Sequence, residues 1–238
     1  MRIDSDVEQI LIDSRVEGQL LFLPHTQLER QLYLKVNKAL EAIGGTWNRK
    51  QKAHLFDYDP ADAIEQIVLT GEFIDPKKEF QFFETPPEIA KQLVEMACIE
   101  KYDYVLEPSA GHGAIAQFLP LPVCAEINPK CQDVLKERGW PVVAYDFLKY
   151  QDRHDVIVAN PPFSKQQDID HVNHMLDIAD KRVVSVMSGS VLFRDNKKTI
   201  QFRDRISKLG GCIEPLPDGA FKSSGTNVRT CVVKVDLT

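Results

Sequence analysis

The sequence predicts an α/β protein: a doubly wound, mostly parallel seven-stranded sheet with an antiparallel C-terminal hairpin, preceded by a small α+β module. Two observations support this prediction. Beyond Phe82, short runs rich in Val and Ile recur with helical stretches between most of them, which is typical of parallel strands buried on both faces. The last two runs are instead joined by a Gly-, Ser- and Asn-rich stretch, which indicates an antiparallel pair at the sheet edge.

The chain has 238 residues, enough for one ordinary domain and a small extra module. We expect an accessory module over residues 1–75 and the main domain over residues 76–238. The apolar spacing and the punctuating Gly and Pro residues predict the elements of the module. These are a weak strand ending at 20–23, a helix over 26–43, two strands at 46–48 and 54–56, and a helix from Pro60 to Gly71.

The main domain is expected to contain seven strands. Five apolar runs predict the parallel strands, at 104–106, 123–125, 142–144, 156–159 and 183–186. Two further runs, 212–214 and 230–235, predict the antiparallel pair. Helical stretches are expected at 130–138 and 169–179, and a helix is expected directly after the first strand.

Composition narrows the environment and the chemistry. The chain has no apolar run near the ~20 residues needed to span a bilayer, and its acidic N-terminus lacks the order of a signal peptide. These features favour a cytoplasmic location without membrane contact. The five cysteines are scattered, with no Cys/His cluster at zinc spacing, so we expect reduced thiols and no metal site.

The formal net charge of −6 is unusual for a nucleic-acid-binding protein, because phosphate neutralisation dominates such binding. Binding would depend on local basic patches. One patch is the segment 48–54, with Arg49 and Lys50, and the other is the segment 194–208. Each patch is equally compatible with an ordinary solvated face, and Trp47 beside the first patch is equally compatible with a core position.

A glycine turn follows the first predicted strand of the main domain. In doubly wound sheets such a turn lies at the carboxyl ends of the strands, where ligands bind, and Gly111 and Gly113 permit a tight bend. A turn of this kind by itself also occurs in dinucleotide sites. The residues of the turn are Glu107, Pro108, Ser109, Ala110, Gly111, His112 and Gly113.

Acidic residues end three successive predicted strands. Glu107 suits a cationic ligand, whereas Glu126, followed by Ile127, can accept the two hydroxyls of a ribose. Asp146 can accept from an adenine amine, and Phe147 can pack on the adenine ring. S-adenosyl-L-methionine carries both an ammonium and a sulfonium, which NAD lacks, so the pattern predicts this cofactor. Taken singly, each carboxylate is also compatible with a helix cap.

The turn Asn160-Pro161-Pro162-Phe163 directly follows the fourth predicted strand. The Asn160 amide oxygen and the Pro161 carbonyl can accept the two hydrogens of an aromatic amine and direct its lone pair toward a methyl donor. The prolines fix the turn before substrate arrives, and Phe163 offers a face for an extruded base. We therefore expect this turn to be catalytic, with Asn160 also near the cofactor. The alternative is a turn that only ends a strand.

At these residues the chain resembles the N6-adenine DNA methyltransferases, in the subgroup whose cofactor motifs precede the catalytic motif. Thr85-Pro86-Pro87-Glu88 is similar to the N-terminal element of that subgroup, which implies that Thr85 and Pro86 contact the methionine part of the cofactor. The resemblance covers roughly residues 80–238. It implies a class I, Rossmann-like methyltransferase fold and methyl transfer from S-adenosyl-L-methionine to adenine N6 in DNA.

Three alternatives remain open. Similar turns serve methyltransferases that act on RNA bases or on protein glutamine amides, and a non-catalytic nucleic-acid-binding subunit would retain the same fold. Members of the family usually carry a large C-terminal recognition domain, which this chain does not show. Recognition would then come from residues 1–75, from a protein partner or from residues 219–229, or would be loose. In the last of these segments, Lys222 and Arg229 either contact phosphate or belong to an ordinary hairpin loop.

Overall fold

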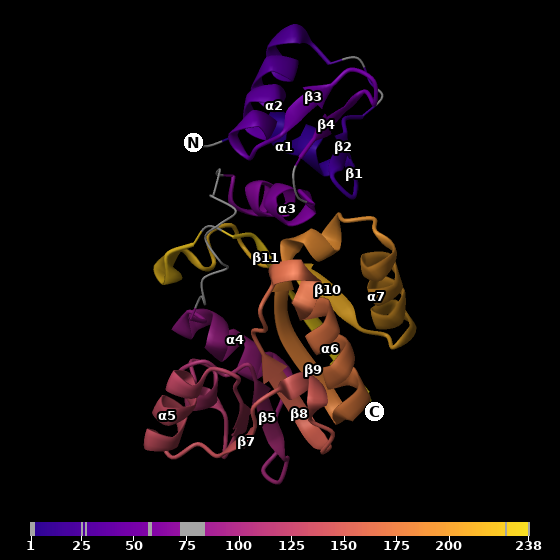
Figure 1. The fold of residues 1–238 in the computed structure, drawn as a ribbon. Helices are drawn as coiled ribbons and strands as arrows, with labels where there is room; N and C mark the ends of the chain where they lie inside the picture. The colour runs from indigo at the N-terminus through magenta and orange to yellow at the C-terminus, as the bar shows by residue number, and fades with distance from the viewer. Residues whose placement is uncertain are drawn as a thin grey trace. The chain divides into compact units, whose positions relative to one another are not determined.

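The computed structural model describes residues 3–24, 26, 28–56, 59–71, 84–226 and 228–237. The chain divides into two compact units, Met1–Gln81 and Phe82–Thr238, which are drawn in Figure 1. The boundary predicted at residues 75 and 76 lies outside the described residues. Each unit is described separately below.

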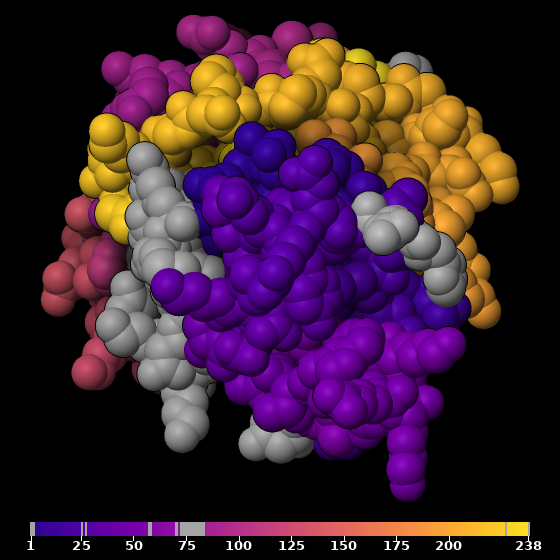
Figure 2. Space-filling model, turned by 90° about the horizontal axis from the view of Figure 1, so that it is seen from above, coloured from indigo at the N-terminus to yellow at the C-terminus, as the bar shows by residue number. Residues whose placement is uncertain are grey.

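Unit 1 is a small α+β module, as predicted, and its indigo and purple residues form one continuous body in Figure 2. Its four strands form an antiparallel sheet in the order β1-β2-β4-β3. The elements are α1 (Ser5–Ile12), β1 (Arg15–Glu17), β2 (Leu20–Phe22), α2 (Arg30–Ala42), β3 (Thr46–Asn48), β4 (Ala53–Leu55) and α3 (Ala61–Thr70).

Residues 3–24 differ from the single weak strand that we expected over the start of the chain. They form α1 and β1 before β2, and Gly18 makes the β1–β2 turn with φ +57. In α1 only Val7 and Leu11 are buried. The helix has only eight residues, fewer than the roughly 11–18 over which a helical period is recognised in a sequence, which explains why it was not predicted.

Unit 2 contains the predicted doubly wound sheet, with the order β10-β11-β9-β8-β5-β6-β7. Strands β5 to β9 pair in parallel, whereas β11 is antiparallel to both of its neighbours. The strands are β5 (Val105–Pro108), β6 (Val123–Ala125), β7 (Val142–Ala144), β8 (His154–Ala159), β9 (Ala179–Ser188), β10 (Cys212–Pro215) and β11 (Thr230–Asp236). The α-helices are α4 (Pro87–Ala97), α5 (Pro129–Glu137), α6 (Gln167–Ile178) and α7 (Lys197–Lys208).

The sheet buries both faces, because alternate residues of its central strands enter two different core clusters. In β8, Ile157 packs with α6 and α7 in one cluster, while the next residue, Val158, packs with α4 in the other. Figure 1 shows these helices on the two sides of the sheet. Burial on both faces is the reason why the strand sequences are almost continuously apolar.

The glycine turn is not followed by the α-helix that we expected. The connection from β5 to β6 contains only a short 3₁₀ helix, η1 (Ala116–Phe118). Pro120 and Pro122 follow it closely, and proline cannot continue a helix because it lacks an N–H and its ring clashes with the preceding turn. The α4 helix, which precedes β5 in the chain, packs in the core cluster that contains Val105 of β5 and Ile115.

All five cysteines are free, and Cys124, Cys131 and Cys231 are buried. Among the described residues, no group of His, Cys, Asp and Glu side chains has the arrangement of a metal site. No helix in the described part of the chain combines the length and apolar character needed to cross a membrane.

Candidate active site

The candidate site lies at the carboxyl ends of the parallel strands. Because β5 to β9 run in the same direction, the turns that follow them meet at one edge of the sheet. This edge carries the glycine turn after β5, Glu126 after β6, Asp146 after β7 and Asn160 after β8. Residues that are far apart in the sequence are thereby brought to one region of unit 2.

The glycine turn has a left-handed backbone at three alternate residues: Ser109 (φ +56), Gly111 (φ +56) and Gly113 (φ +79). Such a conformation costs a non-glycine residue about 1–2 kcal/mol, and strain of this kind is often concentrated at functional sites. At Gly113 the neighbouring group is the indole of Trp140, which would lie 2.3 Å from an added Cβ. Gly113 is therefore required for packing against Trp140.

Glu126 connects the glycine turn to the start of α5. One carboxylate oxygen accepts the Gly111 N–H and the other accepts the Asn128 N–H, each at 2.7 Å. A carboxylate has about four acceptor positions, so these bonds leave capacity for two hydroxyl groups. The buried Gln132 Nε2 donates to the Glu126 carbonyl at 2.6 Å; we did not predict this contact, since a lone glutamine in a helix has no distinguishing sequence pattern.

Glu107 is 2% exposed and accepts the Ala116 N–H at 2.6 Å. Burial raises the pKa of its carboxyl group to about 8, although hydrogen bonds from the backbone at residues 115 and 116 act in the opposite direction. A buried carboxylate is costly unless a positive charge compensates it. The environment of Glu107 therefore suits a cationic ligand.

Asp146 caps η2 (Phe147–Lys149) by accepting the Leu148 N–H at 3.2 Å. Its carboxylate also pairs with Lys149 at 2.8 Å, and this hydrogen bond lowers the pKa of Asp146. Because the group stays ionised, it remains an acceptor for an amine at neutral pH.

Phe147 does not present the free ring face that we expected for adenine. It is 4% exposed, and its ring stacks on His171 with a centroid distance of 5.6 Å and meets His174 edge-on at 4.9 Å. The exposed apolar groups beside the carboxylates are instead Ile127, 72% exposed, and Tyr145, 67% exposed. We did not predict Tyr145 as a site residue. Its position at the end of a strand, next to Asp146, could have indicated it from the sequence.

The Asn160 turn is held by residues from two other segments. Asn160 Nδ2 donates a hydrogen bond to Thr85 Oγ1 at 3.0 Å, and the Thr85 side chain belongs to a buried residue just before α4. Pro161 is buried and Pro162 is exposed. Phe163 is half-buried against the cluster that contains Phe221.

The backbone directly after this turn is strained. Lys165 and Gln166 have φ values of +53 and +57, a conformation that side chains other than glycine rarely adopt. The first turn of α7 holds this segment, because Lys198 Nζ donates to the Gln166 carbonyl at 2.9 Å and Thr199 Oγ1 bonds to Gln166 Oε1 at 3.3 Å.

The loop between β10 and β11 also lies at the carboxyl edge, because it joins the end of β10 to the start of β11. Within it, Lys222 is exposed and Arg229 is half-buried, and the Arg229 carbonyl accepts the Gly189 N–H at 2.9 Å. Ser224 Oγ donates to the Glu84 carbonyl at 2.6 Å, which ties the loop to the residue before Thr85.

The basic segment 194–208 is not a free cationic surface. Lys198 pairs with Asp170 at 2.7 Å, Arg203 with Asp195 at 2.7 Å, and Arg205 with Asp177 at 2.6 Å. These ion pairs neutralise much of the charge that we had considered for phosphate binding. In the structure, these cations chiefly hold α7 against α6 and against the residues that precede α7.

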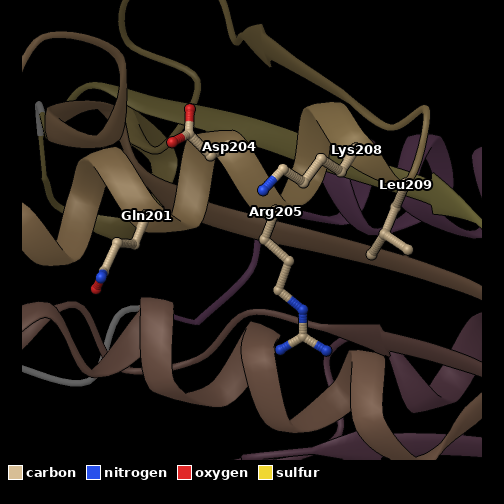
Figure 3. A pocket seen from close by; sticks show the side chains of 5 residues that line it. All are labelled: Gln201, Asp204, Arg205, Lys208 and Leu209. Carbon is tan, nitrogen blue, oxygen red and sulfur yellow. The ribbon is translucent and has the colours of Figure 1, made fainter.

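A surface hollow of about 390 Å³ lies on α7, lined by Gln201, Asp204, Arg205, Lys208 and Leu209 (Figure 3). Arg205 points from α7 toward the neighbouring helix, where Asp177 receives it. Because the end of α7 leads into β10, this hollow lies near the amino ends of the strands. It is therefore separate from the candidate site at the carboxyl edge.

No protein-family model matches the sequence, and no curated protein matches it either. Among solved structures, the chain is similar to the M protein of the type I restriction enzyme EcoKI, with 14% identity and a TM-score of 0.54. It is also similar to a modification subunit assigned to a type I restriction enzyme from Vibrio vulnificus YJ016 (17%, 0.53) and to a dimethyladenosine transferase from Plasmodium falciparum (18%, 0.52).

These alignments cover 96%, 67% and 65% of this chain, respectively. The chain in turn spans 56%, 45% and 63% of the three proteins, so it matches only part of each. At this level of identity the likeness is one of fold. Together with the strand order of unit 2, it establishes the Rossmann-like fold of the class I methyltransferases.

Proposed function

We propose that this protein transfers a methyl group from S-adenosyl-L-methionine to the N6 amine of adenine in DNA. The observation that carries the proposal is the Asn160 amide, held by Thr85 at the same sheet edge as the acidic ends of β5, β6 and β7. An amide that receives a planar amine, beside carboxylates suited to a nucleoside cation, is the arrangement that amine methylation needs.

The side chains at this edge fit the cofactor in three respects. Glu107 is a buried carboxylate in surroundings that favour its neutral form, so a ligand cation would relieve the cost of its charge. Glu126 retains acceptor capacity for ribose hydroxyls after its two backbone bonds. Ile127 and Tyr145 expose apolar surface that a purine ring would cover.

When bound, S-adenosyl-L-methionine supplies an electrophilic methyl group on a sulfonium. The Asn160 side-chain oxygen and the Pro161 carbonyl accept the two N6 hydrogens, which opposes delocalisation of the nitrogen lone pair into the ring. Because Thr85 accepts from Nδ2, the amide is held in one orientation before the base arrives. Phe163 provides an apolar surface on which an extruded base stacks. The surplus N6 proton leaves to water after transfer, so no strong base is required.

The names of the relatives with the same fold are compatible with this proposal. One is a modification subunit and one the M protein of a type I restriction enzyme, and the third is a dimethyladenosine transferase. The first two names favour DNA as the substrate of this chain, and the third favours an adenosine amine. RNA therefore remains the competing substrate that the experiment must separate from DNA.

The test is incorporation of tritiated methyl groups from the cofactor into duplex DNA, RNA and protein, each presented separately. We expect label in duplex DNA, and we expect that label to disappear when every adenine of the DNA carries an N6-methyl group beforehand. Label in RNA or protein with none in DNA would refute the DNA assignment. Absence of label from all three substrates, with the cofactor bound, would indicate a non-catalytic subunit.

Two variants separate the proposed roles. Asn160→Ala should reduce transfer by at least about 100-fold, the effect of losing one pre-positioned polar group, while the calorimetric affinity for the cofactor stays within twofold. Asp146→Asn should do the reverse and weaken cofactor affinity roughly tenfold, because a charged acceptor is replaced. Loss of cofactor affinity in Asn160→Ala, or unchanged affinity in Asp146→Asn, would reassign those residues.

A further inference from the structure

Unit 1 carries an exposed aromatic residue on a β-hairpin. Strands β3 and β4 pair with Trp47 opposite His54, and β3 is the edge strand of its sheet. Trp47 is 43% exposed, whereas His54 is fully buried, and the two rings meet edge-on at 5.1 Å. Trp47 therefore covers His54 and presents its own outer surface to solvent, which excludes the core position considered from the sequence.

The turn of this hairpin has a fixed backbone. Asn48 Oδ1 accepts the N–H of Lys50 at 3.0 Å and the N–H of Gln51 at 3.3 Å. Lys52 completes the turn with φ +51, in the left-handed region. Side chains that project from such a turn are displayed from defined positions, which lowers the entropic cost of binding a partner.

Three cations project from this turn: Arg49, Lys50 and Lys52, all exposed. Among the described residues, no ion pair involves any of these three side chains. In α7, by contrast, three cations form ion pairs with aspartates. Of the two basic segments in the sequence, this turn is therefore the better candidate for binding a polyanion.

We propose that the basic hairpin, residues 46–55, binds the phosphate backbone of duplex DNA, with Trp47 packing against the adjacent deoxyribose. A chain of net charge −6 repels a polyanion in general, so binding must concentrate where cations cluster. A hairpin with three exposed cations and an exposed indole matches the alternating charged and apolar surface of a DNA strand. The choice of DNA as the polyanion rests on the proposed function. The assignment of the hairpin as a polyanion-binding site rests only on its exposed cations and indole.

The test is fluorescence anisotropy of a labelled duplex titrated with the full chain at several salt concentrations, without cofactor. We expect the triple variant Arg49→Gln/Lys50→Gln/Lys52→Gln to bind at least roughly tenfold more weakly at 0.1 M salt. The slope of log K against log salt should also fall by about 2.7, which is about 0.9 for each lost phosphate contact. Unchanged affinity and slope would overturn the proposal.

A charge-matched control removes three exposed lysines elsewhere: Lys38→Gln/Lys136→Gln/Lys208→Gln. This variant should bind DNA within about threefold of the native chain, because dispersed charges act only through the screened field. An equal loss in both triple variants would show a general charge effect and overturn the assignment to the hairpin. Circular dichroism and cofactor calorimetry of both variants verify that each remains folded.

A third variant examines the aromatic contact. Trp47→Ala should weaken binding roughly fivefold while leaving the salt slope unchanged, because packing of an indole is not electrostatic. Unchanged affinity would remove Trp47 from the interface. Tighter binding of an RNA duplex than of the DNA duplex would overturn the choice of DNA. Since no step of the assay requires methyl transfer, loss of hairpin binding and failure of the proposed activity are distinguishable.

Discussion

Asn160 and Thr85, 75 residues apart in the sequence, are joined by a hydrogen bond of 3.0 Å from the Asn160 Nδ2 to the Thr85 Oγ1. The bond directs the nitrogen end of the amide toward Thr85. Because the Thr85 oxygen accepts from Asn160, its own hydroxyl proton is available to donate elsewhere. Thr85 therefore has a second role beyond the cofactor contact suggested by the sequence: it positions the amide on which the proposed chemistry depends.

The first prediction concerns this bond. Thr85→Val keeps the shape of the side chain but removes the acceptor, so Asn160 Nδ2 loses a partner and the amide loses its fixed orientation. We expect kcat for methyl transfer to fall about 10- to 100-fold, the cost of misplacing a reacting group. Thr85→Ser, which retains the hydroxyl, should restore most of the rate.

The measurement is the separation of kcat from cofactor affinity. If Thr85 positions Asn160, Thr85→Val lowers kcat while the calorimetric Kd of the cofactor changes by less than about threefold. If Thr85→Val instead weakens cofactor binding by the same factor as it lowers kcat, Thr85 contacts the cofactor but does not position Asn160.

The second prediction concerns proton release by Glu107. Its pKa is raised to about 8, so the carboxyl group is largely protonated at pH 7 when no ligand is bound. A ligand cation lowers this pKa, and binding should therefore release up to about one proton per site near pH 7. The release is measured by calorimetry of cofactor binding in buffers with different ionisation enthalpies.

Glu107→Gln is the matched control, because it mimics the protonated carboxyl group and cannot release a proton. Identical proton release in the native chain and in this variant would contradict the assignment. The same pKa has a consequence for stability without ligand. The contribution of protonated Glu107 is complete below its ordinary pKa of 4.5 and is lost as the pH rises through about 8.

The third prediction compares two glycines that share a left-handed backbone. Gly113 has φ +79 and lies against the indole of Trp140, whereas Gly139 has φ +80 and no neighbour within 4 Å of an added Cβ. Gly139→Ala should cost about 1–2 kcal/mol from backbone strain alone. Gly113→Ala should cost a further 1–3 kcal/mol or so, from the clash with the indole.

Urea denaturation of the two variants gives both free energies of unfolding. Equal losses would show that Trp140 moves aside without cost. Because Gly113 belongs to the glycine turn, Gly113→Ala should also weaken cofactor binding, whereas Gly139→Ala should leave the Kd unchanged.

The fourth prediction concerns acid stability and His154 at the start of β8. This residue is 1% exposed, its ring stacks on Tyr104 at 4.2 Å, and its Nε2 bonds to the Tyr150 hydroxyl at 3.1 Å. Burial lowers the pKa of His154 from 6.5 to about 4. The stability contributed by the neutral ring is therefore complete above pH 6.5 and is lost as the pH falls through about 4.

At pH 5 this linkage corresponds to a loss of about 2 kcal/mol relative to pH 7. Denaturation curves of the native chain and of His154→Gln at both pH values measure the effect. The native chain should lose more stability between pH 7 and pH 5 than the variant does. The same loss in both proteins would assign the acid sensitivity to other groups.

The sequence by itself determined the strands of unit 2, whereas the helix expected after the glycine turn is absent and α4 and α7 were not predicted. Its central strands are buried on both faces, so near-continuous runs of Val and Ile mark them in the sequence. The strands predicted at 123–125 and 142–144 match β6 and β7. The acidic strand ends and the Asn160 turn were also apparent, because in a parallel sheet the end of each strand faces the same edge.

Only the tertiary structure decided the contacts around these residues. The Thr85–Asn160 bond and the Trp140 indole against Gly113 join segments whose proximity no local pattern records. The burial of Phe147 against two histidines of α6 has the same origin. Local sequence patterns report which face a residue presents, whereas the partner that it meets depends on how distant elements pack. For this reason the edge of the sheet could be predicted, but the groups that orient Asn160 could not.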